Sequence, residues 1–98
     1  MALLEINMRY IDVEWIHDLE DEPFRLVSEI GDDNFELRKL EFCRNGKLGF
    51  ASGETHTENT MLGIVEVPQL EEINSDVEFQ GISISKQEFE QLWQKYVP

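Results

Sequence analysis

The sequence predicts an α+β domain, an antiparallel sheet of about four to five strands with a C-terminal amphipathic helix packed on one face. Short segments of alternating apolar and polar residues follow one another with turn-forming residues between them. An Asn-Gly pair separates two β-prone segments, and the final residues repeat apolar side chains at helical spacing. The 98 residues suit one hydrophobic core, so we expect a single domain over residues 1–98.

The first half of the chain supplies three expected strands separated by turn formers. In the first of them, Ile11, Val13 and Trp15 alternate with Tyr10 and its charged neighbours, which predicts an apolar face toward the core and a polar face toward water. In the third, the parity of the apolar residues changes, which favours a bulge near Arg38. The expected strands cover residues 9–15, 24–30 and 35–44.

The middle of the chain begins with the strongest local signal. Asn45-Gly46 predicts a tight hairpin with a type I′ turn, because that turn needs positive φ at both central residues. The polar stretch 52–60 predicts an exposed loop, and the β-rich segment 61–67 predicts a further strand. Pro68 then opens a predicted helical turn over residues 69–74.

The last predicted element is a helix. Ser85 and Glu88 have the spacing of a capping box, in which a serine hydroxyl and a glutamate carboxylate satisfy free backbone donors. Apolar side chains then recur at i, i+3, i+4 and i+7, which indicates one face packed on the sheet. These side chains are Phe89, Leu92, Trp93 and Tyr96.

The charge indicates the kind of partner. Eight Lys and Arg residues against 21 Asp and Glu give a net charge of −13, which repels phosphate backbones and anionic lipids. Neither direct nucleic-acid binding nor membrane binding is expected. Residues 11–24 and 48–85 contain no Lys or Arg, so they form either a solvated surface or a docking face for a basic protein surface. The candidate partner-binding residues are Asp18, Glu20, Asp21, Glu22, Glu54, Glu58, Glu71 and Glu72.

The candidate reactive residues are few. His17 lies among four carboxylates and invites interpretation as a metal or acid/base site, but His56 is the only other histidine and has no companion at ligand spacing. Cys43 lies in an apolar run, where packing explains it better than nucleophilic catalysis. No phosphate-binding loop or dinucleotide fingerprint occurs. We therefore expect no catalytic residue, metal or cofactor, and a protein that is not an enzyme.

A cytoplasmic location is expected. The single cysteine excludes an internal disulfide and suits a reducing compartment. The N-terminus lacks the basic region and apolar core of a secretion signal, and residues 1–7 are interpreted either as a leader before Met8, an alternative start, or as a flexible N-terminus. The chain is expected to be a monomer, or a homodimer formed by edge pairing of the predicted strand 61–67.

The sequence also resembles a known family over residues 8–96. The marks of this resemblance are Trp-Ile-His-Asp followed by Asp-Glu-Pro, the Arg-Asn-Gly hairpin, and Phe-Glu-Gln-Leu-Trp near the end. They are similar to those of small bacterial proteins catalogued only as a domain of unknown function. The resemblance implies a small stand-alone bacterial cytoplasmic protein, and it implies no catalytic residue.

Two functional hypotheses follow. The first is an acidic protein-binding module, of the inhibitor or immunity type, that occludes the basic nucleic-acid-binding surface of a nuclease or a nucleic-acid-guided complex. The second is a small ligand-binding or metal-binding domain, or an enzyme, that uses His17 and the nearby carboxylates.

Overall fold

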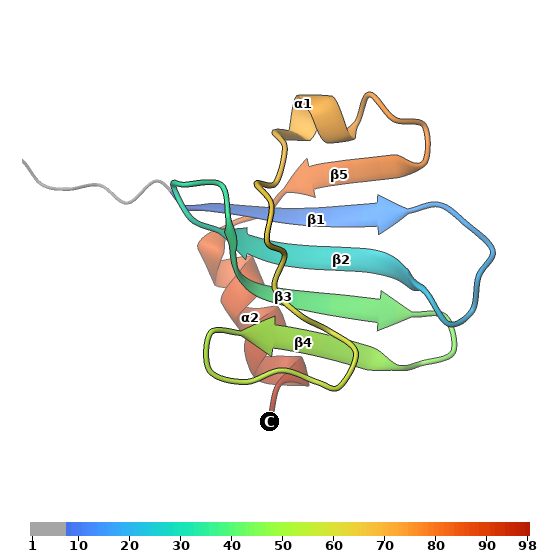
Figure 1. Cartoon of the computed structure of the whole chain (residues 1–98), viewed down its shortest axis with the longest axis vertical. Coiled ribbons are helices and arrows are strands. Elements are labelled where there is room, and N and C mark those ends of the chain that lie inside the picture. The colour runs from blue at the N-terminus through green and yellow to red at the C-terminus, as the bar shows by residue number, and fades with distance from the viewer. Residues whose placement is uncertain (1–7) are drawn as a thin grey trace, which may run out of the picture.

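The computed structural model describes residues 8–98, which form a five-stranded antiparallel sheet with two helices. The strand order is β4-β3-β2-β1-β5, as Figure 1 shows. The predicted α+β class is confirmed, whereas the leader or flexible N-terminus expected at residues 1–7 lies outside the described residues. The elements are β1 (Arg9–Trp15), β2 (Pro23–Ile30), β3 (Glu36–Cys43), β4 (Leu48–Ser52), α1 (Leu70–Ile73), β5 (Phe79–Ser83) and α2 (Lys86–Tyr96).

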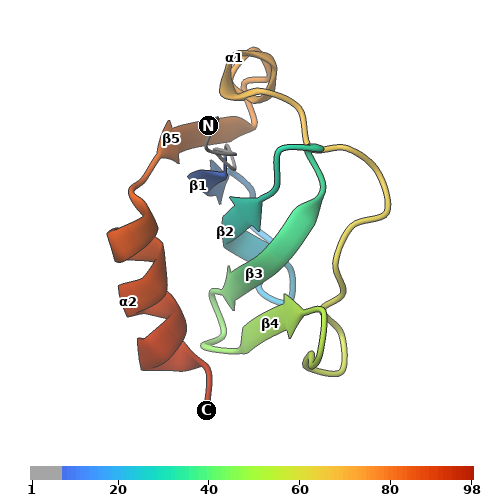
Figure 2. The ribbon, with the colours of Figure 1, turned by 90° about the vertical axis from the view of Figure 1, so that its left-hand side faces the viewer.

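Helix α2 covers one face of the sheet, as predicted (Figure 2). The capping box at its start is complete, because the Ser85 hydroxyl accepts from the Glu88 amide and the Glu88 carboxylate accepts from the Ser85 amide, each at 3.0 Å. Phe89 is fully buried against Tyr10 and Leu40. Neither helix in the described part of the chain is long and apolar enough to cross a membrane.

Tyr10 does not face water as the alternation in β1 predicted. It is only 6% exposed, because α2 packs over the side of β1 that was expected to be polar. Its hydroxyl donates to Glu29 at 3.0 Å. Glu29 in turn accepts from Arg38 at 2.7 and 2.8 Å, and Arg38 also donates to Glu90 of α2 at 2.9 and 3.0 Å. This network joins β1, β2, β3 and α2.

The buried Tyr10 hydroxyl predicts a loss of stability at high pH. Burial, followed by the hydrogen bond to Glu29, raises the pKa of Tyr10 to about 12 from an ordinary value of 10.0. The contribution of this group is therefore complete below its unfolded pKa and is lost as the pH rises from 10 to about 12. Over that range we expect the free energy of unfolding, measured by urea denaturation, to fall by about 2 kcal/mol more for the wild type than for Tyr10→Phe. Equal losses for the two proteins would contradict this prediction.

Two irregularities shape the pairing of β2 with β3. Leu37 is an extra residue between two paired positions of β3, so the predicted bulge is confirmed one residue before Arg38. A second register shift, at Phe24 in β2, was not predicted.

The β3–β4 hairpin is confirmed, but its turn is not type I′. Gly46 has φ +88°, whereas Asn45 does not have a positive φ. The Gly46 amide donates to the Cys43 carbonyl at 3.0 Å, and the Cys43 amide donates to the Lys47 carbonyl at 3.0 Å. The loop is therefore a three-residue connection ending in a left-handed glycine, which requires only one residue with positive φ.

The predicted strand 61–67 is wrong. This segment is part of a strap, residues 57–69, that crosses the sheet face opposite α2 between β4 and the predicted helical turn, which is confirmed as α1 (Figures 1 and 2). The fifth strand is instead β5, which the sequence prediction missed. The strap is anchored by hydrogen bonds from Thr60 to Glu41 (3.3 Å), from the Gly63 amide to Glu36 (2.7 Å) and from the Val67 amide to the Asn34 carbonyl (2.7 Å).

Parts of both sheet edges are occupied by other segments of the chain. At the edge of β4, Ala51 forms a bridge with His56 from the loop that follows. At the edge of β5, the Asn74 side chain accepts from the Gly81 amide at 2.6 Å and donates to the Gly81 carbonyl at 2.9 Å, as a neighbouring peptide would. Residues 61–67 form no strand, so they do not offer the edge that was expected to pair in a homodimer. The oligomeric state stays a prediction.

Candidate functional site

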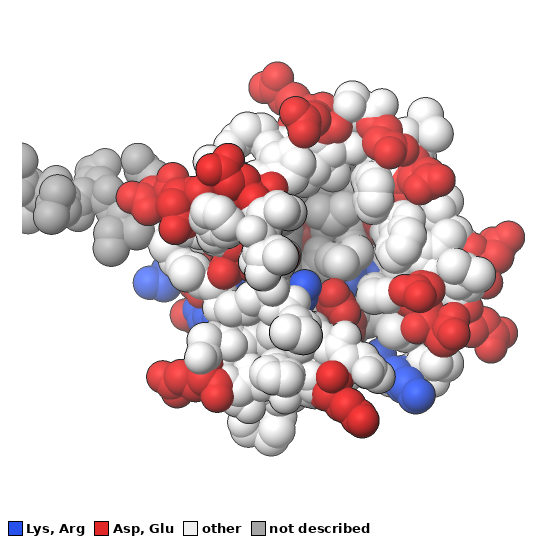
Figure 3. Space-filling view, viewed as in Figure 1, with Lys and Arg blue, Asp and Glu red and all other residues white. Residues whose placement is uncertain are grey.

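The open face of the sheet, opposite α2, carries the candidate site. Its half nearest β5 is partly covered, because Leu70 and Ile73 of α1 pack against Ile11, Val13 and Ile30. Its other half is crossed only by the strap. In Figure 3, which looks onto this face, acidic side chains surround a hollowed centre in which a few basic and acidic atoms are also visible.

A groove of about 910 Å³ lies on this face beside the strap. We call it the acidic groove. Leu26 and Glu41, which are paired between β2 and β3, both line it. Trp15 contributes an aromatic wall, and its ring is held between Phe79 (centroids 6.1 Å apart) and His17 (4.4 Å). The charged residues lining the groove are Asp21, Glu22, Glu41, Lys47 and Glu58.

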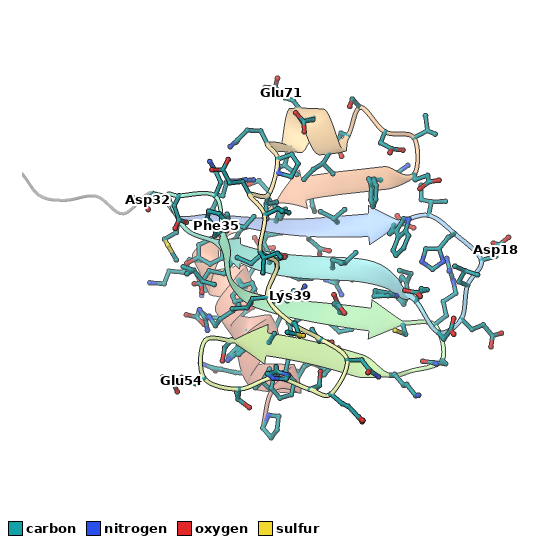
Figure 4. The ribbon with its side chains drawn as sticks, viewed as in Figure 1. Asp18, Asp32, Phe35, Lys39, Glu54 and Glu71 are labelled. Atoms are coloured by element: carbon teal, nitrogen blue, oxygen red, sulfur yellow. The ribbon has the colours of Figure 1, made fainter. Side chains whose placement is uncertain are left out.

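A lysine beneath the strap compensates part of this negative charge. The Lys39 ammonium lies 3.4 Å from Glu36 and 3.5 Å from Glu41, and all three side chains are less than a fifth exposed. Figure 4 shows Lys39 near the middle of the open face. Because both carboxylates also accept hydrogen bonds from the strap, this cluster joins the strap to β3. One cation between two carboxylates leaves a net negative charge beside the groove.

All eight candidate acidic residues are exposed, but only some of them meet. Asp21 and Glu22 from the β1–β2 loop and Glu58 from the strap line the acidic groove. Glu72 lines a smaller groove of about 380 Å³ beside α1. The other predicted residues, Asp18, Glu20, Glu54 and Glu71, line neither groove.

The acidic residues away from the groove are spread around the open face. In Figure 4, Asp18 lies beyond the β1–β2 end of the sheet, Glu54 lies at the far end of β4 and Glu71 lies on α1. The two acidic runs of the sequence therefore form an interrupted ring and not one continuous patch.

His17 has a structural role within the β1–β2 loop. Its Nδ1 accepts from the Leu19 amide at 3.0 Å, so Nε2 carries the proton that is donated to the Pro23 carbonyl at 2.7 Å. Both ring nitrogens are thus engaged by backbone groups. Among residues 8–98, no three His, Cys, Asp or Glu side chains are grouped to hold a metal ion.

Cys43 lies at the end of β3 and lines the acidic groove, so it is a half-buried wall residue instead of the core residue that the sequence predicted. Burial, together with the nearby carboxylates of Glu41, Glu22 and Asp21, raises the pKa of its thiol. The neutral thiol is therefore favoured, and a thiol in this state is a weak nucleophile.

The strap exposes three apolar residues that the sequence prediction had placed in a strand and not on an exposed surface. Met61 is 67% exposed, Ile64 is 91% exposed and Val65 is 71% exposed. The sequence contained one signal of this exposure: the apolar residues of 61–67 occur in adjacent pairs around Gly63 and do not alternate as in a half-buried strand.

Comparison of this chain with known proteins identifies its family. Neither curated proteins nor solved structures provide a match to this chain. A family described as "Domain of unknown function (DUF6881)" has a model that matches residues 9–98, which cover the sheet and both helices. The resemblance in the sequence is confirmed on this point: the chain belongs to the family described as domain of unknown function (DUF6881).

Proposed function

We propose that this protein is an acidic protein-binding module that places its open face on a basic surface of a partner protein. The observation that carries the proposal is the combination, on one face, of exposed apolar strap residues with a surrounding ring of carboxylates. Protein interfaces commonly have this anatomy, with an apolar centre that is desolvated on binding and a polar rim.

The two parts of the face have different roles in this proposal. The ring of carboxylates attracts Lys and Arg on the partner, which accelerates association and makes it sensitive to salt. Ile64 and Val65 lose water when the complex forms, so they slow its dissociation. A partner surface of matching charge is one that binds phosphate backbones, as in a nuclease or a nucleic-acid-guided complex. The protein then acts as an inhibitor or immunity protein that competes with nucleic acid.

The test begins with affinity capture from the native host by the full chain, followed by purification of the captured protein. Its dissociation constant is then measured for the wild type, for Ile64→Thr/Val65→Thr and for Ile82→Thr. Ile82 is a suitable control because it is 61% exposed and pairs with Asp12, which places it on the α2 side of the sheet. We expect the strap variant to bind about tenfold more weakly and the control to bind as the wild type does.

A competition experiment completes this test. A labelled nucleic acid bound to the captured protein should be displaced by the wild type, and the wild type should associate with the captured protein more slowly at high salt. Simultaneous binding of both would overturn the inhibitor proposal. Equal affinity of the strap and control variants would overturn the assignment of the open face.

A further inference from the structure

The acidic groove can receive a part of the partner that the exposed strap residues do not contact. Its volume of about 910 Å³ lies in the range of about 300–1,000 Å³ that ligand pockets occupy, so it accommodates a short stretch of peptide. Its walls also differ from those of an apolar pocket, because carboxylates from two separate segments approach it together.

The charges that line the groove favour a cation. Asp21, Glu22 and Glu58 are exposed at the groove, and Glu41 is 17% exposed within it. Lys47 is the one basic residue among the described residues that line the groove, and Lys39 compensates part of the charge of Glu41 from beneath the strap. The balance remains negative.

The apolar part of the groove lining favours a long cationic side chain. Trp15 and Leu26 also line it, so an aliphatic stem can pack against them while its charged end reaches the carboxylates. Carboxylates from the β1–β2 loop and from the strap both line the groove. A planar guanidinium with five donors can bond to both, whereas an ammonium is a compact point charge.

We propose that the acidic groove binds an arginine-bearing extended segment of the partner protein. This inference rests on the proposed function, because the segment belongs to the same basic partner. It adds the chemistry of the segment and its location: the guanidinium lies between Glu22 and Glu58, and the side-chain stem lies along Trp15.

The test uses two pairs of substitutions that remove the same charge at different places. Glu22→Gln/Glu58→Gln removes two carboxylates that line the groove, and Glu54→Gln/Glu71→Gln removes two that do not. All four side chains are exposed, so both double variants should fold. The probe is a capped hexa-arginine peptide, with capped hexa-lysine as the comparison.

Binding is followed by the fluorescence of Trp15 in the Trp93→Phe background, where it is the only tryptophan. Calorimetric titration of the chain with its native tryptophans provides a second measurement that needs no replacement of Trp93. We expect a saturable change on adding hexa-arginine, with affinity about tenfold lower for the groove pair and within about twofold of the wild type for the other pair.

Each other outcome is informative. If both pairs weaken binding equally, or if Trp15 does not respond, the groove assignment is overturned while the open-face proposal stands on its own test with Ile64 and Val65. If hexa-lysine binds as tightly as hexa-arginine, the groove recognises charge alone and the assignment to arginine is overturned.

Discussion

Replacing Arg38 by alanine should lower the free energy of unfolding by about 3 to 5 kcal/mol. Arg38 makes two hydrogen bonds to Glu29, whose side chain is only 8% exposed, and its guanidinium lies over the rings of Phe89 and Trp93 at 4.9 and 5.1 Å. Its removal leaves the buried Glu29 carboxylate with the Tyr10 hydroxyl as its remaining side-chain hydrogen-bond partner within residues 8–98. Urea denaturation, monitored through tryptophan fluorescence, measures this loss.

Arg25→Ala is the matched control for this prediction. Arg25 also bonds a carboxylate of a neighbouring strand, Asp12 at 2.7 Å, and lies over an aromatic ring, but its side chain is 34% exposed. Pairs that water can reach contribute about 1 kcal/mol or less. We therefore expect a much smaller loss for this variant. Equal losses for Arg25→Ala and Arg38→Ala would show that burial of Glu29 is not the cause.

Local signals predicted the elements that local interactions stabilise. The α2 capping box is formed by Ser85 and Glu88 alone, and the alternation of β1 requires only the sheet itself. Strand β5 lacks such a signal, because Gly81 interrupts its short run of β-prone residues. That glycine leaves room for close packing: a Cβ atom there would lie 2.8 Å from the Leu70 side chain of α1 and 3.2 Å from the Val13 side chain of β1. This constraint exists only in the folded chain.

The position of residues 61–67 depends on contacts distant in the sequence. The segment has the composition of a strand, yet its neighbour Thr60 is fixed by Glu41 and its last residue, Val67, is fixed by Asn34. Those contacts hold it across the sheet, so Ile64 and Val65 face water. A pattern of residue types within seven positions cannot show that the sheet edges are occupied elsewhere.

The sequence predicted that the acidic residues of the candidate site are exposed, but not which of them lie together. Exposure of the acidic residues follows from their positions in turns and polar loops, and all eight are exposed. That Glu22 and Glu58 line one groove depends on the strap returning from β4 across the face of the sheet. Trp15 was assigned to an apolar face correctly, but it is only half-buried there and lines the groove.

Gly49→Ala should disturb the strap and the groove together. Thr60 is only 4% exposed and lies directly over Gly49, so a Cβ atom added there would lie 1.9 Å from the Thr60 hydroxyl. Thr60 must then move and lose its hydrogen bond to Glu41. Overpacking of this kind destabilises a fold by about 1 to 3 kcal/mol, which urea denaturation can measure. Because Thr60 and Glu58 line the groove, hexa-arginine should also bind more weakly.

The control for this change is Gly53→Ala, because a Cβ atom at Gly53 meets nothing within 4 Å. It should leave both the free energy of unfolding and peptide binding close to their wild-type values. Adding Thr60→Ala to Gly49→Ala removes the hydroxyl that causes the overlap, so it should recover part of the stability without restoring the hydrogen bond to Glu41. If Gly49→Ala lowers stability while hexa-arginine binds unchanged, the strap contributes to the fold but does not shape the groove. The expected result is that Gly49→Ala lowers both stability and binding, whereas Gly53→Ala changes neither. The contact between Thr60 and Gly49 would then link the packing of the sheet to the surface that is proposed to bind the partner.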